Sequence, residues 1–158
     1  MTQELNDIVG RRGELLFELA ILEYHGLPHV LFRASFLGDK WPAADYVVEL
    51  ENVPNSSPAM FVQVKATSQQ LGQSHIEISL PPDKRDALFR ITGPTYLVGV
   101  HEPSKKAYIL SVHQQSPTGI YRIPLTHELH LANLQRLYDE VKTFWQGRTS
   151  KPINSVFS

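Results

Sequence analysis

The stretch that most constrains the fold is residues 61–67 (FVQVKAT), which alternate apolar and polar residues with the period of two of a β-strand. Val62 and Val64 then point to one face of the strand, and Gln63 and Lys65 point to the other. Because apolar residues also flank the polar pair, we expect this strand to lie inside a sheet rather than at its wet surface. A lysine held near a sheet centre needs an acidic or phosphate partner. The rest of the chain must supply that partner.

A carboxylate partner is predicted on the preceding strand. Residues 45–50 (DYVVEL) are rich in aromatic and β-branched residues, and residues 51–59 have the Asn, Pro and Ser content of a loop. Pairing the two strands as an antiparallel hairpin puts Asp45 opposite Lys65, at the same end of the sheet as Gln63. From these three residues alone, an ordinary Asp–Lys ion pair across the two strands is the more common explanation.

Composition restricts the classes of protein to consider. The chain has 158 residues, no cysteine and a formal net charge of -1. We predict a single domain over residues 1–147, followed by a polar tail over residues 148–158. The absence of cysteine excludes disulfides and thiolate metal sites, and the absence of a long apolar run predicts a cytoplasmic protein without a membrane partner. The near-neutral charge excludes a globally basic nucleic-acid binder, so any phosphate affinity must come from a local patch.

The first predicted helix carries a second candidate carboxylate, Glu14. Residues 7–24 are expected to form this helix, with Asp7 as its cap, and to be largely buried because their middle part is apolar on nearly every side. Gly10 and Gly13 lower helix propensity, which indicates close packing of the first turns against another element. A surface pair between Glu14 and the nearby Arg11 or Arg12 is the plain alternative.

The other elements are predicted from periodicity and from turn signals. They are, in chain order, strands over residues 29–36 and 75–80, a helix from residue 81 to about residue 91, strands over residues 95–101 and 107–112, and a helix that starts near residue 126. With the two strands described above, this order predicts a mixed α/β fold in which helices flank a sheet. His127 and His130, three residues apart on the last helix, have a spacing that can hold a metal, although a structural role is more common.

Three segments of the chain together resemble the PD-(D/E)XK nuclease superfamily, which has the restriction-endonuclease-like fold. They are residues 10–14 (GRRGE), Asp45 and residues 62–65 (VQVK). The resemblance spans residues 10–112 and is nearest to the branch that carries Q-x-K, such as Mrr-type methyl-directed restriction enzymes and small bacterial domains with the pattern G-x-x-G-E, D, VQVK. It implies an αβββαβ core, with a mixed sheet flanked by helices and here an extra C-terminal helix.

The resemblance also implies a site. Glu14, Asp45, Gln63 and Lys65 occupy the positions of the family's catalytic residues, and Asp45, Gln63 and Glu14 those of its ligands for Mg²⁺ or Mn²⁺. Two departures from the family pattern are visible. Ala43-Ala44 replace the Gly-Ile that often precedes the second-strand acid, and Gln63 replaces the usual acid of the third strand. A Gln offers only a neutral oxygen to a hard cation.

The function implied by the resemblance is metal-dependent hydrolysis of DNA phosphodiester bonds, in defence, restriction or repair, by a protein that is expected to act as a homodimer. Candidate phosphate-binding residues are Arg11, Arg12, Arg33 and Lys40. A non-catalytic module of the same fold, which binds nucleic acid or a protein partner as an accessory or immunity component, is the alternative. A scaffolding domain with an ordinary Asp45–Lys65 ion pair is a third hypothesis. Catalysis requires these side chains to meet in one cleft, whereas the scaffold predicts no cleft.

Overall fold

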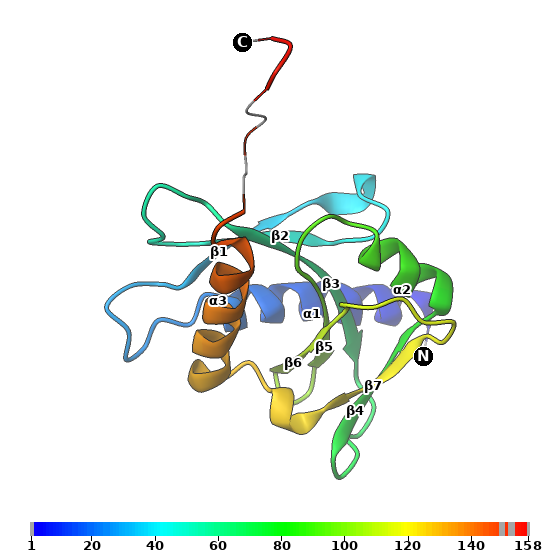
Figure 1. Cartoon of the computed structure of the whole chain (residues 1–158). Coiled ribbons are helices and arrows are strands. Elements are labelled where there is room, and N and C mark those ends of the chain that lie inside the picture. The colour runs from blue at the N-terminus through cyan, green and yellow to red at the C-terminus, as the bar shows by residue number, and fades with distance from the viewer. Residues whose placement is uncertain (1, 149–150, 152–153, 158) are drawn as a thin grey trace.

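The chain forms a mixed α/β fold with a five-stranded sheet at its centre (Figure 1). The computed structural model describes residues 2–148, 151 and 154–157, so part of the predicted polar tail lies outside the described residues. The elements in chain order are α1 (Gln3–Ile21), β1 (Phe32–Phe36), the 3-10 turn η1 (Gly38–Lys40), β2 (Tyr46–Leu50), β3 (Ala59–Thr67), β4 (His75–Leu80), α2 (Pro82–Phe89), β5 (Thr95–His101), β6 (Lys106–Ser111), β7 (Ile120–Pro124), the 3-10 turn η2 (Leu125–His127) and α3 (Leu131–Trp145).

The large sheet has the strand order β1-β2-β3-β5-β6. Its neighbouring strands are antiparallel except for β3 and β5, which are parallel. A parallel pair requires a crossover, and here β4 and α2 form it. The order α1-β1-β2-β3-α2-β5 confirms the predicted αβββαβ core, and α3 is the predicted extra helix at the C-terminal end.

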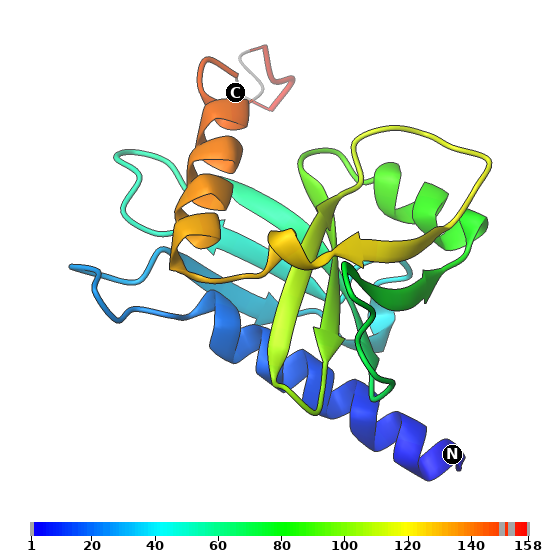
Figure 2. The same cartoon turned by 90° about the horizontal axis from the view of Figure 1, so that it is seen from below.

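Two hydrophobic cores lie on opposite faces of this sheet. Val62 and Val64 of β3 pack in one core with Phe17 of α1 and Leu137 of α3. Phe61, which points the other way, packs in the second core with residues of β4, α2 and β7. The helices α1 and α3 therefore share one face, while α2 and the small β4–β7 sheet cover the other. Figure 2 shows α1 along the lower edge of the molecule and α3 at a steep angle to it.

The central strands confirm the sequence prediction most closely. Every residue of β5 is buried, as expected for a strand between β3 and β6 whose two faces both support a core. The bounds of β4 and β5 are those predicted. In β3, Val62 and Val64 are buried while Gln63 and Lys65 are partly exposed. The predicted two faces of this strand are therefore present.

The prediction for the first helix was wrong at both ends and in its burial. The helix begins at Gln3, because the side chain of Thr2 rather than Asp7 caps it by accepting a hydrogen bond from the Leu5 amide. It ends at Ile21. Gly13, Phe17 and Ile21 are its buried residues, because only one side of the helix contacts the sheet. Apolar residues all around a helix do not bury it when a single layer covers it.

A strand was missed near the C-terminal end, and the last helix starts later than predicted. Residues Ile120–Pro124 form β7, which pairs with β4 in the small sheet. The helix α3 starts at Leu131, after the short turn η2. Its predicted buried stripe is present in Leu134, Leu137 and Val141. None of the helices in the described part of the chain is both long enough and apolar enough to cross a membrane.

Candidate active site

The candidate site lies in a notch at the edge between β2 and β3. Pairing of these strands ends where the Asp45 amide donates to the Val62 carbonyl at 2.9 Å, but β3 continues to Thr67. Over this extension β3 pairs with β5 on its other side. The edge of β3 toward β2 thus loses its strand partner beyond Val62. Asp45, the last residue before β2, stands at the open corner.

The side chain of Asp45 replaces the missing strand partner. Its Oδ2 accepts hydrogen bonds from the Val64 amide at 2.7 Å and from the Gln63 side-chain amide at 2.9 Å. The predicted register was wrong by two residues, because Tyr46 pairs with Val62 and so sets Asp45 against Gln63 rather than Lys65. The loop is two residues shorter than predicted, because the Leu50 amide donates to the carbonyl of Pro58.

The Asp45 carboxyl group is electrostatically destabilised in its ionised form. Burial raises its pKa above the ordinary value, and the nearby Glu14 carboxylate raises it further. The Val64 amide and the Lys65 ammonium act in the opposite direction but do not cancel these effects. Asp39, on the turn η1, adds another negative charge that raises the pKa. A cation at this corner would therefore relieve an unfavourable concentration of negative charge.

Two contacts place α1 so that Glu14 reaches the notch. A Cβ atom on Gly13 would lie 2.4 Å from the Cβ of Ala66, so glycine allows the helix to approach β3. The fully buried Tyr46 donates its hydroxyl to Glu18 at 2.7 Å, and its oxygen lies 3.3 Å from the Glu14 carbonyl. The predicted close packing is thus present at Gly13. The contact of Tyr46 with α1 was not predicted, because a tyrosine in a strand sequence is typical of an ordinary core residue.

The four predicted catalytic residues line one pocket of about 500 Å³. The pocket brings Glu14 from α1 together with Asp45 before β2 and with Gln63 and Lys65 from β3. This convergence is what catalysis requires, and it contradicts the hypothesis of a scaffold without a cleft. Among the ion pairs of the described residues there is none between Asp45 and Lys65. The lysine is partly exposed in the pocket, and its ammonium group forms no ion pair with any carboxylate of the described residues.

Further residues of α1 line the pocket, and sequence reasoning missed Asn6 among them. Asn6 and Gly10 lie about two turns and one turn before Glu14 on the same face of α1. A Cβ atom at Gly10 would meet nothing within 4 Å. Gly10 therefore leaves open space in the pocket, unlike Gly13, which allows close packing. The repeated spacing of four residues from Asn6 through Gly10 to Glu14 was the sequence signal that could have identified this face.

The predicted phosphate-binding residues lie outside the lining of the pocket. Arg11 pairs with Glu14 at 2.9 Å, so the plain surface pair is present even though Glu14 also lines the pocket. Arg12 pairs with Glu102, and Arg33 pairs with Glu49 and Glu51 at the far side of β2. Lys40 ends the turn η1. Of these four residues, the three arginines thus already have carboxylate partners within the chain.

The oxygen atoms at the notch are of the type that binds a hard divalent cation, but only two of the side chains that supply them are carboxylates. Asp45 and Glu14 supply carboxylate oxygens, and Gln63 supplies a neutral carbonyl oxygen, all of which are oxygen ligands of the type that Mg²⁺ and Mn²⁺ prefer. The described residues contain no cluster of three or more His, Cys, Asp or Glu side chains that could hold a metal. Water molecules and a substrate phosphate would have to complete the coordination, as is usual for Mg²⁺.

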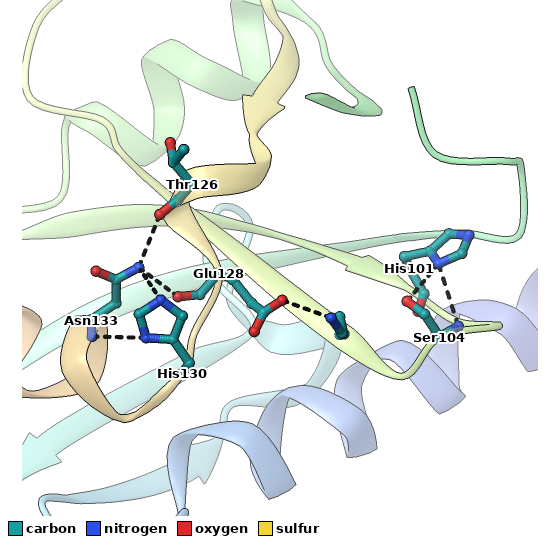
Figure 3. A network of polar contacts seen from close by, with 7 residues as sticks. His101, Ser104, Thr126, Glu128, His130 and Asn133 are labelled. Atoms are coloured by element: carbon teal, nitrogen blue, oxygen red, sulfur yellow. Dashed lines mark hydrogen bonds and ion pairs between the residues drawn. The ribbon is translucent and has the colours of Figure 1, made fainter. Parts of the chain in front are cut away.

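The histidines of the C-terminal part have structural contacts instead. His130 caps α3 by accepting from the Asn133 amide at 3.3 Å. Figure 3 shows the Asn133 side chain directed back to the Thr126 and Glu128 carbonyls, to which it donates at 3.0 and 2.7 Å. His127 contacts the Ile109 carbonyl through Nδ1 at 2.9 Å. Each of these two histidines thus has a polar contact within the fold.

Comparison with known proteins gives only distant structural similarity. No protein-family model and no curated protein sequence matches the chain. Among solved structures, the chain is similar to the Holliday junction resolvase Hjc from Archaeoglobus fulgidus, an archaeal hyperthermophile, with 14% sequence identity and a TM-score of 0.40. The match covers 79% of this chain and 88% of the resolvase chain. A similarity of this strength gives no information on activity or substrate.

Proposed function

We propose that the protein is a nuclease that hydrolyses DNA phosphodiester bonds with the help of Mg²⁺ or Mn²⁺, in defence, restriction or repair. The observation that carries the proposal is the convergence of Glu14, Asp45, Gln63 and Lys65 on one pocket. These residues come from three elements that are far apart in the sequence. Two carboxylates and a lysine in one pocket fit phosphodiester hydrolysis, which needs a cation, an activated water and charge stabilisation on the phosphate.

The residues would divide these tasks according to their contacts. Asp45, with Oδ2 fixed by two hydrogen bonds, and Glu14 would hold the divalent ion, and the Gln63 oxygen would add a neutral ligand. The bound ion would supply a Lewis acid and make water a better nucleophile. Lys65 lacks an ion-pair partner among the described residues, so its ammonium group is available to contact a phosphate oxygen and to orient the attacking water.

The shape of the pocket supports a substrate with an extended backbone. Gly10 leaves one wall without a side chain, and Thr67 and Ser68 line the pocket at the end of β3 with hydroxyl groups. Neutral donors and backbone amides of this kind commonly contact phosphates. Because the arginines near the pocket have carboxylate partners, they would contribute to DNA binding only by exchanging those partners for phosphates.

A non-catalytic module with the same fold is the second candidate, and one observation favours it. The side-chain amide of Gln63 donates to Asp45, so it occupies a carboxylate oxygen that a metal would otherwise use. With this oxygen occupied, the pocket would bind a nucleic acid or a protein partner without cutting. The module and the nuclease predict different results in a cleavage assay.

The test is cleavage of plasmid, linear, branched and single-stranded DNA in the presence of Mg²⁺ or Mn²⁺. We expect the wild-type protein to cut at least one of these substrates, and both Asp45→Ala and Lys65→Ala to abolish cutting. Lys84→Ala and Asp139→Asn remove the same kinds of charge from exposed positions on α2 and α3, and they should cut like the wild type.

Two results would contradict the nuclease. One is cleavage that persists in Asp45→Ala, which would indicate a contaminating enzyme or another site. The other is no cleavage of any substrate together with no rise in melting temperature on addition of the metal ion. The second result would leave the non-catalytic module, whose DNA affinity a binding assay with the same substrates would measure.

A further inference from the structure

An exposed tryptophan follows the turn η1 close to the candidate site. Trp41 comes directly after η1 and is 45% exposed. Its ring stacks on the ring of Phe61, with the two centroids 5.6 Å apart and an angle of 24° between the planes. Trp41 has no other aromatic contact among the described residues. Because Phe61 covers one face of the indole, the exposed surface of Trp41 lies on its other face and along its edge.

The loop that carries Trp41 is attached to the site at its base. The Leu37 amide donates to the Asp45 carbonyl at 2.8 Å, so the segment between these two residues is a closed loop. Ala44 is buried in the core below it. Asp39, in the same loop, lies near enough to Asp45 to raise its pKa. The chain thus holds Trp41 close to the carboxylate that is proposed to bind the metal ion.

The stacked pair of rings shares a face of β3 with two residues of the pocket. Phe61, Gln63 and Lys65 are separated by two residues each, so their side chains point to the same face of the strand. Phe61 and Gln63 are about 7 Å apart along β3 at the rise of a β-strand. Consecutive bases of a stacked strand are about 3.4 Å apart. A base that stacks on Trp41 would therefore belong to a nucleotide only a few positions from a phosphate in the pocket.

A cation lies next to this ring in the sequence. Lys40 is exposed, and its ammonium group forms no ion pair with any carboxylate of the described residues. The three arginines that were predicted to bind phosphate already have carboxylate partners. Lys40 and Trp41 thus offer a cation and an aromatic face side by side, and proteins bind single-stranded nucleic acid with this combination of groups.

A stacking surface of this kind distinguishes unpaired from paired DNA. Inside a continuous duplex, the neighbouring base pairs cover both faces of every base, so no face remains for an indole ring. A base in a single strand or at a branch has an open face, which stacks well on an aromatic side chain. The plain alternative is that Trp41 only covers Phe61, and this alternative predicts no effect of the ring on DNA binding.

We infer that Trp41 is a stacking platform for an unpaired base and that Lys40 contacts a phosphate next to it. The substrate class that follows is DNA with a single-stranded segment or a branch close to the cleaved bond. This inference rests on the proposed function, since it takes the pocket as the place where the phosphodiester lies. A continuous duplex would lack the stacking contact and would bind more weakly.

The experiment uses the fluorescence of Trp41 itself. The chain has two tryptophans, so Trp145→Phe leaves Trp41 as the only one. Trp145 lies at the end of α3 and outside the lining of the pocket. Stacking of a base quenches indole fluorescence. In the presence of Ca²⁺, which takes oxygen ligands as Mg²⁺ does, we expect a single-stranded oligonucleotide to quench Trp41 and closed circular duplex DNA to leave its fluorescence unchanged.

The affinity of the full chain for a labelled single strand, measured by fluorescence anisotropy, tests how much the ring contributes. Trp41→Ala should weaken this binding by about 5- to 150-fold, the range for the loss of one base–aromatic stack, and Trp41→Phe should retain most of it. Competition with closed circular DNA should show the same duplex affinity in all of these proteins. Tyr121→Ala removes an exposed aromatic side chain from β7, and it should bind both DNAs like the wild type.

The contribution of Lys40 is measured by salt dependence. Lys40→Ala should reduce the slope of log affinity against log salt concentration by about 0.7, the value for one phosphate contact on a single strand. Lys84→Ala removes the same charge from an exposed position on α2 and should leave the slope unchanged. Circular dichroism confirms that each variant is folded.

Three results would overturn the inference. The first is a single strand that does not bind, or that binds without a change in the fluorescence of Trp41. The second is a Trp41→Ala variant that binds the single strand as tightly as the wild type, which would leave Trp41 as a cover for Phe61. The third is equal quenching by closed circular duplex DNA, which would contradict the preference for unpaired bases.

These outcomes are separate from those of the cleavage assay. A wild type that cuts no DNA, but whose affinity for the single strand falls in Trp41→Ala, would contradict the nuclease and retain the platform. A wild type that cuts DNA, with equal single-strand affinity in Trp41→Ala, would retain the nuclease and remove the platform.

Discussion

Two hollows of the molecule differ in size and in the charges of their walls. One is the pocket at the notch between β2 and β3, and the other is a groove between α3 and the strands β5 and β6. The groove is the larger of the two, with adjoining cavities of about 530 and 410 Å³ that share Tyr96, Ser111 and Glu140 in their walls. The pocket at the notch has about 500 Å³. Size alone would therefore direct attention to the groove.

Two polar side chains in the groove, Tyr96 and Thr95, have hydrogen-bond partners. Tyr96 donates its hydroxyl to Glu140, and the neighbouring Thr95 donates to the Val112 carbonyl at 2.9 Å. At the notch, by contrast, burial and the nearby Glu14 carboxylate raise the pKa of Asp45, so that its negative charge costs stability. A charge that costs stability, more than volume, distinguishes a site for chemistry from a packing defect.

The largest expected contrast is between two glutamates. Glu14→Gln at the notch should lower the rate of DNA cleavage by about 100-fold or more, because it removes a carboxylate proposed to hold the cation. Glu140→Gln in the groove makes the same change and should leave the rate within about two-fold of the wild type, since surface changes away from a site have small effects. Initial rates on one DNA substrate measure both. Equal losses in the two variants would mean that the groove, too, takes part in function.

A second contrast concerns the two glycines of α1. Gly13→Val should destabilise the protein by about 1–3 kcal/mol, because its new side chain would collide with Ala66. Gly10→Ala has open space at the same helix and should raise stability by up to about 1 kcal/mol through helix propensity. Urea denaturation measures both free energies of unfolding. A tolerated Gly13→Val would show that α1 does not pack on β3 as closely as described.

Two buried tyrosines, one beside each hollow, allow the same substitution to be compared for its effects on stability and on cleavage. Tyr46→Phe and Tyr96→Phe each remove a hydroxyl that donates to a glutamate, and each should cost about 1 kcal/mol of stability. Only Tyr46→Phe should also lower cleavage, by about 3- to 10-fold, because Tyr46 positions the helix turn that carries Glu14. Thermal unfolding and cleavage rates separate the two effects. Unchanged cleavage in Tyr46→Phe would remove its positioning role.

The smallest expected effect is a pH-dependent stability gain in Asp45→Asn. The folded state holds the Asp45 pKa above its ordinary value of 3.8, so ionisation of Asp45 lowers stability. This loss is absent well below the ordinary pKa, develops as the pH rises from the ordinary pKa to the raised one, and is complete above it. The variant should therefore match the wild type at low pH and exceed it at pH 7 by about 1 kcal/mol, as stabilising substitutions do. Free energies of unfolding measured across this pH range provide the check, and a variant that is less stable at pH 7 would contradict the raised pKa.

The central part of the fold was predictable because its sequence patterns are local. Alternation in residues 61–67 and the apolar run of residues 95–101 define β3 and β5, whose packing follows from their composition alone. The end of α1 and the strand β7 were not predictable in the same way. Burial of α1 depends on how many layers cover it, and β7 is a strand because β4 lies next to it.

Four residues that line the pocket were named from the sequence, but their contacts were not predictable. Glu14, Asp45, Gln63 and Lys65 were identified by their resemblance to a family motif, and the structure brings them together in one pocket. The pairing of Asp45 with Gln63 depends on the strand register, which the loop over residues 51–59 sets and which no local pattern specifies. The raised pKa of Asp45 depends in turn on burial and on the position of Glu14.

The most direct test of the proposed site is a crystal structure of the protein grown with Mn²⁺ and examined by anomalous scattering. We expect a manganese peak in the pocket beside Asp45 and Glu14 in the wild type, and no such peak in crystals of Asp45→Asn. Crystals of the wild type that show no manganese at the pocket at millimolar Mn²⁺, or that show it at the groove instead, would contradict a metal-dependent site at the notch.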